Sequence, residues 1–138
     1  MAEKVYVTRR ETFAAAHRLF KPELGDEENF KLFGKCSNPN WHGHNYTLEV
    51  VVSGEVDKST GFVLDISILK KVIKEKIISK VDHKNLNTET DFMQGLNPTS
   101  ENIVIAIWKE LVNEIPNGNL HSVKLYETEN NYFEYKGE

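Results

Sequence analysis

The sequence predicts an antiparallel α+β domain, and three observations lead to that fold class. Apolar residues alternate with polar ones in the first third of the chain, recur at helical spacing through the middle, and alternate again near the end. The predicted elements therefore follow the order β, β, α, α, β, β, which is typical of an antiparallel sheet with helices packed against it. A chain of 138 residues has room for one domain, so we expect residues 1–138 to fold as a single unit.

Two strands are predicted before the helices. The first covers residues 5–12, where β-branched and aromatic residues alternate, and the same alternation continues toward Leu19. The second covers residues 44–56, with alternate apolar side chains on one face. Between them, residues 21–40 hold glycines, prolines and an acidic cluster, and this composition predicts a long polar loop.

Two helices and a hairpin complete the predicted fold. Apolar residues recur at helical spacing over residues 64–77, with Asp65 or Ser67 as the N-cap. A second helix is expected to begin at residues 98–101 and to end before Pro116. Residues 122–127 and 132–136 then read as a hairpin around Asn130-Asn131, a pair that tolerates positive φ.

Composition excludes several classes of protein. The net charge is −4 and no block of Lys or Arg exceeds two residues, so neither nucleic acid nor a membrane surface is an expected partner. No apolar run approaches the roughly 20 residues that span a bilayer, and the N-terminal residues lack the apolar core of a signal peptide. We therefore expect a cytoplasmic protein, whose single cysteine stays reduced.

The strongest chemical signal is the segment Trp41-His42-Gly43-His44. Histidines two apart on a strand point to the same face, so both imidazoles can reach one ion, and His17 on the first predicted strand adds a third. Three neutral imidazoles suit zinc with one open position, and affinity should fall below about pH 6 as the rings protonate. The alternative is a chance pair of surface histidines.

Cys36 lies six residues before His42, in a loop rich in glycine and proline. The neighbouring Lys35 would favour its thiolate form, which would make Cys36 a reactive thiol with a pKa below the free value. One alternative is a small buried hydrophobe. Another is a fourth zinc ligand in a closed, structural site.

Asp82-His83 follows the first predicted helix. A carboxylate that binds one imidazole nitrogen can orient the ring and prepare it for acid–base work. Adjacent residues face each other only where the chain turns, so this interpretation predicts a turn at this point. The alternative is an ordinary surface turn.

Glu127 lies within an otherwise apolar strand pattern near the end of the chain. A carboxylate in that position can accept two N–H bonds from the edge of a guanidine-like heterocycle. The alternative is an exposed acid at the end of a strand. His121 has no partner in the sequence and is expected to be structural.

Taken together, these segments resemble the 6-pyruvoyl-tetrahydropterin synthase family over nearly the whole chain. Six motifs carry the resemblance, in order along the chain: Phe13–Leu19, Gly34–Asn40, His42–Tyr46, Asp82–Leu86, Pro98–Asn102, and Tyr126–Thr128 followed by Tyr135–Glu138. Six motifs in register over some 120 residues are highly specific. Trp41 is a departure, because animal members typically have glycine there, and the rim of the pocket is expected to differ.

The resemblance implies a fold, an assembly and an activity. The fold would be the tunnelling fold, in which subunits join antiparallel sheets into a barrel with helices outside, usually as a hexamer made of two trimers. The activity would be that of a carbon–oxygen lyase that acts on 7,8-dihydroneopterin triphosphate and releases triphosphate to give 6-pyruvoyl-tetrahydropterin. One zinc ion per subunit is implied, and Mg²⁺ beside the triphosphate is considered as well.

The resemblance also implies roles for individual residues. The zinc ligands would be His17, His42 and His44; proton transfer would use Cys36, Asp82 and His83, the last two from a neighbouring subunit; Glu127 would anchor the pterin, with Thr99, Ser100 and Glu101 close to its ring. Apart from the resemblance, departure of the triphosphate needs positive charge, and the nearby candidates for it are Lys35, Arg18 and Lys84.

Two other functions stay open on sequence grounds. The sister branch, 6-carboxy-tetrahydropterin synthase of the 7-deazaguanine (queuosine) pathway, would share substrate, zinc site and Asp-His pair. Its loop between the cysteine and the first histidine of the pair is usually shorter than the five residues 37–41 found here, which favours the pyruvoyl branch. A non-catalytic pterin- or zinc-binding protein of the same fold is more remote, because Cys36, Asp82 and His83 are all present.

Overall fold

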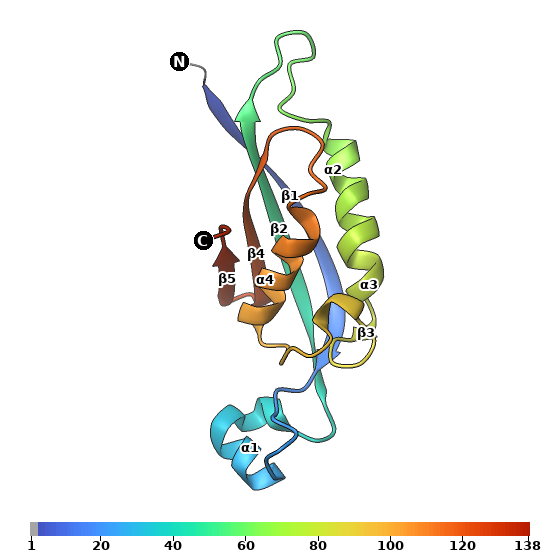
Figure 1. The fold of residues 1–138 in the computed structure, drawn as a ribbon, viewed down its shortest axis with the longest axis vertical. Coiled ribbons are helices and arrows are strands. Elements are labelled where there is room, and N and C mark those ends of the chain that lie inside the picture. The colour runs from blue at the N-terminus through green and yellow to red at the C-terminus, as the bar shows by residue number, and fades with distance from the viewer. Residues whose placement is uncertain (1–2) are drawn as a thin grey trace.

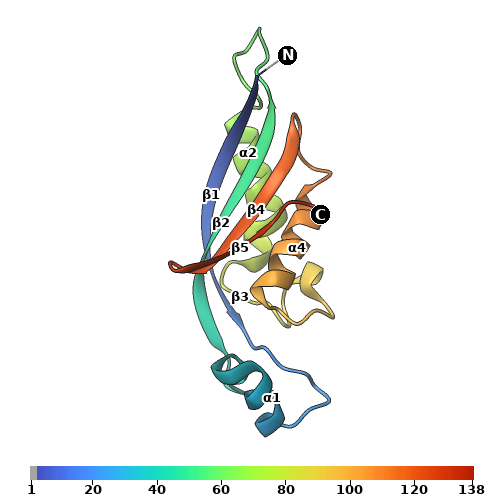
Figure 2. The ribbon, with the colours of Figure 1, turned by 90° about the vertical axis from the view of Figure 1, so that its left-hand side faces the viewer.

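The structure, a computed structural model, describes residues 3–138 and confirms the α+β fold class. Its elements run in this order: β1 (Lys4–His17), α1 (Asp26–Phe33), the 3₁₀ turn η1 (Gly34–Ser37), β2 (His42–Glu55), α2 (Ile66–Ile73), the π-helical segment η2 (Lys74–Ile78), α3 (Ser79–Val81), β3 (Lys84–Asn85), the 3₁₀ turn η3 (Asp91–Met93), α4 (Ser100–Leu111), β4 (Asn119–Thr128) and β5 (Asn131–Tyr135). The strands form one sheet in the order β3-β1-β2-β4-β5. Both α2 and α4 cover the same face of that sheet (Figure 1, Figure 2).

The long strands β1 and β2 form the centre of the sheet. They pair antiparallel along their whole length, from Lys4 opposite Glu55 to His17 opposite His42. This pairing fits the predicted antiparallel sheet. Strand β1 includes the continuation of the alternating pattern as far as His17, and β2 begins two residues before its predicted start. Toward the paired histidines, alternate side chains of β1 are buried, because one face of the sheet packs on the helices while the other does not.

The helix predicted to begin near Asp65 is present as the continuous run α2, η2 and α3. Asp65 caps it by accepting a hydrogen bond from the Ser67 amide at 2.9 Å. Its fully buried apolar side chains lie four residues apart, at Leu69, Ile73, Ile77 and Val81. A spacing of four drifts around an α-helix of 3.6 residues per turn, and the wider π turn at 74–78 offsets that drift. The apolar stripe therefore stays on the sheet up to Asp82 and His83.

The C-terminal half follows the sequence prediction closely. Helix α4 begins at Ser100, and the Thr99 hydroxyl caps it by accepting a hydrogen bond from the Asn102 amide at 3.2 Å. Strands β4 and β5 form the predicted hairpin, with its turn at residues 129–130. Strand β4 also pairs with β2, which brings the end of the chain beside the segment that starts at His42.

The long polar loop predicted over residues 21–40 is wrong in part, because α1 and η1 lie within it. Three acidic residues occupy the first turn of α1, where they complement the positive end of the helix dipole. Its one buried side chain is the polar Asn29, while Phe30 and Leu32 are exposed. The helix thus has no apolar stripe of the kind that reveals helices in a sequence. Helix α1 lies beyond the end of the sheet (Figure 1).

The two-residue strand β3 was also missed. It pairs in parallel with β1, opposite Ala15 and Ala16, and is too short to give a periodic pattern. The main hydrophobic core lies between the sheet and the two long helices, and includes Leu48 on β2 and Ile107 on α4. Among residues 3–138, no helix combines the length and apolar character needed to cross a membrane.

Candidate functional site

Three histidines meet where β1 ends and β2 begins. His17 lies opposite His42 in the strand register, and His44 follows two residues later on the same face of β2. One ring nitrogen from each residue lies within 4.8 Å of the others, and the rings pack edge to face. The structure therefore brings the three predicted metal ligands together at the end of one strand pair.

The nitrogens of this cluster fit a metal ion. Four of them are buried without a hydrogen-bond partner in the described part of the chain: Nε2 of His17, Nδ1 and Nε2 of His42, and Nε2 of His44. Buried polar atoms are rarely left unpaired, because each costs about 1–3 kcal/mol. Three imidazoles without a carboxylate or thiolate form the donor set of an open, tetrahedral zinc site.

Contacts around His17 prepare it as a ligand. Its Nδ1 lies 2.9 Å from the carbonyl oxygen of Pro98 and 3.3 Å from the hydroxyl of Tyr46. A proton on Nδ1 is donated to the carbonyl, which leaves Nε2 with a free lone pair. Burial lowers the pKa of His17 to about 4, and burial followed by the charge of His44 lowers the pKa of His42. His17 therefore stays neutral, the form that binds metal, down to about pH 4, and the lowered pKa of His42 favours the neutral form of that ring as well.

Cys36 faces the same space as two of the histidines. It lies in η1, and together with His42 and His44 it lines a cavity of about 840 Å³ that extends under α1. The thiol is free and does not belong to the group of ligand atoms that lie within 4.8 Å of one another. Cys36 is thus placed beside the histidine cluster, within reach of a molecule that fills the cavity.

One expectation for Cys36 is wrong for the chain as described. The sequence predicted that Lys35 would lower the pKa of the thiol. Instead, burial and then the negative charge of Glu127 raise the pKa of Cys36. The reason is that Glu127, which is remote in sequence, folds back beside the cluster on β4, whereas Lys35 is exposed to solvent.

Glu127 is held in place by the N-terminal turn of α4. The hydroxyl of Ser100 donates to Glu127 Oε2 at 2.6 Å, and Glu127 Oε1 lies 3.9 Å from Nε2 of His44. The carboxylate is about one quarter exposed, so it is not the freely solvated strand-end acid of the alternative interpretation. The neighbouring Thr99 hydroxyl is engaged as the helix cap, and Glu101 is exposed.

Asp82 and His83 form the predicted turn. His83 has a φ of 60°, and this left-handed conformation brings its Nδ1 to 3.1 Å from Asp82 Oδ1. Asp82 also accepts a hydrogen bond from the Ala14 amide at 3.0 Å. That bond, followed by the contacts with His83, holds the pKa of Asp82 below its ordinary value. The carboxylate is therefore ionised and anchored to β1, while the His83 ring is largely exposed.

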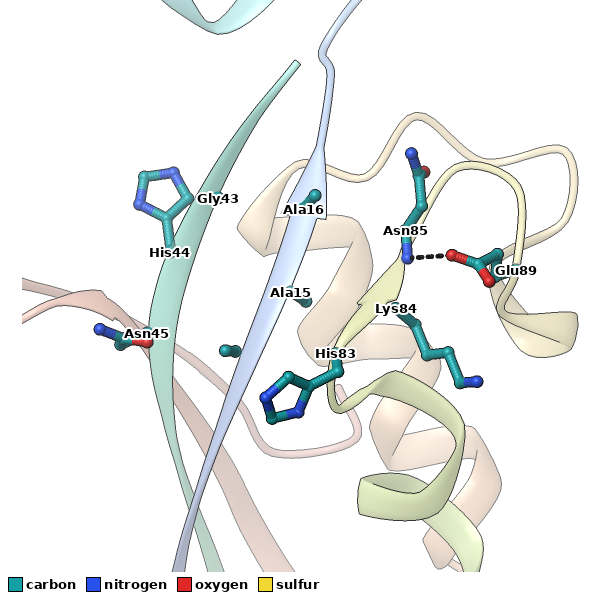
Figure 3. Close-up of a pocket in the computed structure, with 10 residues that line it drawn as sticks. Ala15, Ala16, Gly43, His44, Asn45, His83, Lys84, Asn85 and Glu89 are labelled. Atoms are coloured by element: carbon teal, nitrogen blue, oxygen red, sulfur yellow. Dashed lines mark hydrogen bonds between the residues drawn. The ribbon is translucent and has the colours of Figure 1, made fainter.

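His83 opens onto a different hollow from Cys36. It lines a cavity of about 470 Å³ with Lys84 and Asn85, and His44 also borders it. In Figure 3, β1 and β2 lie between the rings of His83 and His44. Within one chain, the structure therefore places Cys36 and Glu127 beside the histidine cluster, but it does not bring His83 into the cavity that Cys36 lines.

Comparison with known proteins agrees with this arrangement. Residues 6–138 match the family described as 6-pyruvoyl tetrahydropterin synthase. The 6-pyruvoyl tetrahydrobiopterin synthase of Pongo abelii is 51% identical over 132 residues, which cover 96% of this chain and 91% of that protein. A solved structure of Caenorhabditis elegans 6-pyruvoyl tetrahydropterin synthase has a TM-score of 0.92 at 40% identity, covering 99% of this chain and 98% of that one.

The chain belongs to the 6-pyruvoyl tetrahydropterin synthase family. It is therefore an enzyme of the lyase type with the tunnelling fold, as the resemblance implied. A more distant relative, from Archaeoglobus fulgidus, is named a putative 6-carboxy-5,6,7,8-tetrahydropterin synthase. It is 32% identical over 136 residues, which cover 99% of each protein.

Two members of this synthase-family site were missed in the sequence. Tyr46 lies two residues after His44, so its position on the same face of β2 as the histidines follows from strand periodicity. The Pro98 carbonyl, by contrast, leaves no side-chain signal, because its role depends on where the backbone turns before α4.

Trp41, the predicted departure from the family pattern, adopts a left-handed φ of 66°. This conformation suits the glycine typical of animal members, and the Trp41 ring packs edge to face on Phe20.

Proposed function

We propose that the chain is a zinc-dependent 6-pyruvoyl-tetrahydropterin synthase that converts 7,8-dihydroneopterin triphosphate to 6-pyruvoyl-tetrahydropterin with loss of triphosphate. The observation that carries the proposal is one cavity in which unpartnered histidine nitrogens and the Cys36 thiol face the same space. The names of the closely similar relatives support the choice of product, and the substrate is the one that the family resemblance implies. One zinc ion per subunit is proposed, with Mg²⁺ accompanying the triphosphate.

The residues divide the chemistry between them. His17, His42 and His44 would hold the zinc ion through their buried nitrogens. When bound, that ion would supply Lewis acidity toward the side-chain oxygens of the substrate and positive charge that favours a neighbouring thiolate. Cys36 would then accept a carbon-bound proton at Sγ, within the cavity that it lines with His42 and His44.

Glu127 would recognise the pterin ring. The 2-amino group and ring N3–H present two donors along one edge, and a carboxylate is suited to accept both. The hydrogen bond from Ser100 fixes the orientation of the Glu127 carboxylate and leaves further lone pairs for the ring. Thr99 and Glu101 flank Ser100 and would lie close to the bound ring.

Asp82 and His83 would move oxygen-bound protons, and they would act on the site of a second copy of the chain. The support is geometric, because His83 is largely exposed and faces a cavity separate from that of Cys36. We propose a hexamer made of two trimers, as is usual in the family. Light scattering should give a mass close to six times 15.9 kDa, and a monomer that turns over the substrate would contradict the shared site.

The second candidate is 6-carboxy-tetrahydropterin synthase, supported by the relative that is 32% identical over nearly the full chain. That branch would use the same substrate and the same zinc site. The pyruvoyl branch is favoured by the higher identity of its relatives and by the five residues between Cys36 and His42. The two candidates differ in what happens to the side chain of the pterin, so only the product separates them.

Product identification tests the proposal. The zinc-loaded protein is incubated with 7,8-dihydroneopterin triphosphate, and the products are analysed by mass spectrometry and by assay of released triphosphate. The proposal predicts one equivalent of triphosphate for each 6-pyruvoyl-tetrahydropterin formed. A 6-carboxy product would identify the sister activity, and unchanged substrate would reject both.

A further inference from the structure

The segment Arg18–Lys21, which we call the connecting segment, lies between the end of β1 at His17 and the part of the chain that leads to Cys36. It follows His17 directly and belongs to no helix or strand. The amide of Leu19 nevertheless donates to the carbonyl of Cys36 at 2.8 Å. Leu19 thus lies two positions after His17, a proposed metal ligand, and is hydrogen-bonded to the backbone of Cys36, the proposed proton acceptor.

Three asparagine side chains replace the strand partners that this segment lacks. Asn87 pairs with both backbone groups of Arg18, accepting from its amide at 3.0 Å and donating to its carbonyl at 2.9 Å. Asn97 accepts from the amide of Phe20 at 3.2 Å. The buried Asn29 of α1 pairs with both backbone groups of Lys21, accepting from its amide at 2.8 Å and donating to its carbonyl at 3.1 Å. The backbone is therefore held in one conformation without belonging to the sheet.

The side chain of Arg18 ties this segment to the loop that carries the thiol. Its Nε donates to the carbonyl of Ser37 at 2.8 Å, and its terminal nitrogen lies 3.2 Å from Asp26 on α1. The guanidinium stacks over the ring of Phe20, 4.0 Å from the ring centroid. Only 12% of the side chain is exposed. Arg18 is thus mostly buried, and two of its guanidinium nitrogens bond to protein groups.

We propose that Arg18 is a positioning residue that fixes Cys36 relative to the histidine cluster. The inference rests on the proposed function, since a fixed distance matters only if Cys36 transfers a proton at that site. Arg18 bonds the carbonyl of the residue after Cys36, and the Leu19 amide bonds the carbonyl of Cys36 itself. Two adjacent peptide groups of the thiol loop are therefore held by two adjacent residues that follow His17.

The test measures the chemical accessibility of Cys36, the single cysteine of the chain. The rate of iodoacetamide alkylation is followed by mass spectrometry on the zinc-loaded protein at one pH. Arg18→Gln removes the guanidinium contacts, and losing a charged hydrogen bond of this kind should raise the rate by about tenfold through easier opening of the loop. Arg9→Gln is the matched control, because Arg9 lies in β1, the strand that precedes Arg18, and within residues 3–138 its one ion pair is with Glu11; its rate should match wild type.

Kinetics provide the second readout. Misplacing a reacting group by about 1 Å can cost about 100-fold in rate, so kcat of Arg18→Gln should fall by about 10- to 100-fold while KM and zinc content stay constant. Arg18→Lys keeps a cation beside Asp26 but lacks the planar, forked donor group. It should lie between Arg18→Gln and wild type in both measurements.

The outcomes separate this proposal from the proposed function. If wild type does not turn over the pterin triphosphate, the proposed function fails, while the alkylation rates still test the position of Cys36. An alkylation rate in Arg18→Gln equal to that of Arg9→Gln would overturn the positioning role. Loss of zinc in proportion to kcat would overturn it too, because Arg18 would then support the metal ligands rather than the thiol. If Arg18→Gln does not fold, Asn87→Asp takes its place, since it keeps the side-chain shape but cannot donate to the Arg18 carbonyl.

Discussion

The two halves of the site are built in different ways. The histidine cluster lies on β1 and β2, whose ladder fixes His17 opposite His42 over 14 paired residues. Cys36 lies on a four-residue 3₁₀ turn, and the position of the His83 ring depends on the positive φ of His83 itself. The comparison teaches that the proposed metal ligands are fixed by the sheet, whereas the proposed proton-transfer groups depend on a few individual hydrogen bonds.

The largest effect is expected on substitution within the histidine cluster, which β1 and β2 hold in place. His42→Ala should remove nearly all bound zinc, because a site of three imidazoles that loses one retains only two protein ligands. Metal analysis of the purified variant checks this, with Arg9→Gln as the control that keeps full zinc. Full zinc occupancy in His42→Ala would exclude the cluster as the metal site.

The next largest effect is expected on substitution of Cys36, and the histidine cluster should stay intact. Cys36→Ala should bind one zinc per chain and lose turnover by about 10²–10⁴-fold, the range typical of a lost general base. Cys36→Ser should keep a trace of activity. Turnover and zinc content are measured on the same sample. A variant that loses both zinc and its fold would show that Cys36 belongs to a structural site.

Glu127 lies beside His44 of the histidine cluster and tests substrate recognition. Glu127→Ala should weaken pterin binding by about 2–4 kcal/mol, or about 30- to 1,000-fold, because two ring donors would be left buried and unpaired. Glu127→Gln keeps the shape but offers one acceptor atom, so its loss should be smaller. Binding of neopterin is measured by calorimetry. Zinc content should stay unchanged in both variants, and wild-type affinity in Glu127→Ala would remove pterin recognition from the account.

The smallest expected effect concerns stability and pH. In the unfolded chain His17 has its ordinary pKa near 6.5, and burial lowers it to about 4 in the folded chain. As pH falls from 6.5 toward 4, the unfolded state binds the proton first, so the zinc-free protein should lose up to about 3 kcal/mol of stability. Stability should not change from this group above pH 6.5.

Urea unfolding of the zinc-free protein across this pH range checks the prediction. The matched variant is His17→Gln, which cannot titrate at this position and should reduce the slope between pH 6.5 and 4, leaving the smaller contribution of His42, whose pKa is also lowered. The carboxylates with lowered pKa values, including Asp82, act only below their ordinary value of 3.8 and lie outside the window. Identical pH curves for wild type and His17→Gln would contradict the burial argument.

The same contrast explains how much the sequence could predict. His17, His42 and His44 were predictable because strand periodicity places alternate side chains on one face, and the structure confirms the pairing. The turn at Asp82-His83 was predictable from chemistry, because adjacent residues need a turn to interact. These features depend on local order, which sequence patterns encode.

Other features depend on contacts between distant segments. The raised pKa of Cys36 comes partly from Glu127, 91 positions away in sequence. Helix α1 has no apolar stripe, and its position depends on Asn29 bonding to Lys21. The bond between His17 and the Pro98 carbonyl likewise joins groups that no motif connects. Such contacts become visible only in the folded chain.

The central claim is that the three histidines bind zinc while Cys36 lies beside the ion without binding it. X-ray absorption spectroscopy at the zinc edge of the zinc-loaded protein tests this most directly. The account predicts only light-atom ligands at about 2.0–2.1 Å, three of them imidazoles, and no sulfur. The spectrum of Cys36→Ala should then match that of wild type. A zinc–sulfur shell at about 2.3 Å in wild type that is absent from Cys36→Ala would contradict the account, because the thiol would be a ligand and not a proton acceptor.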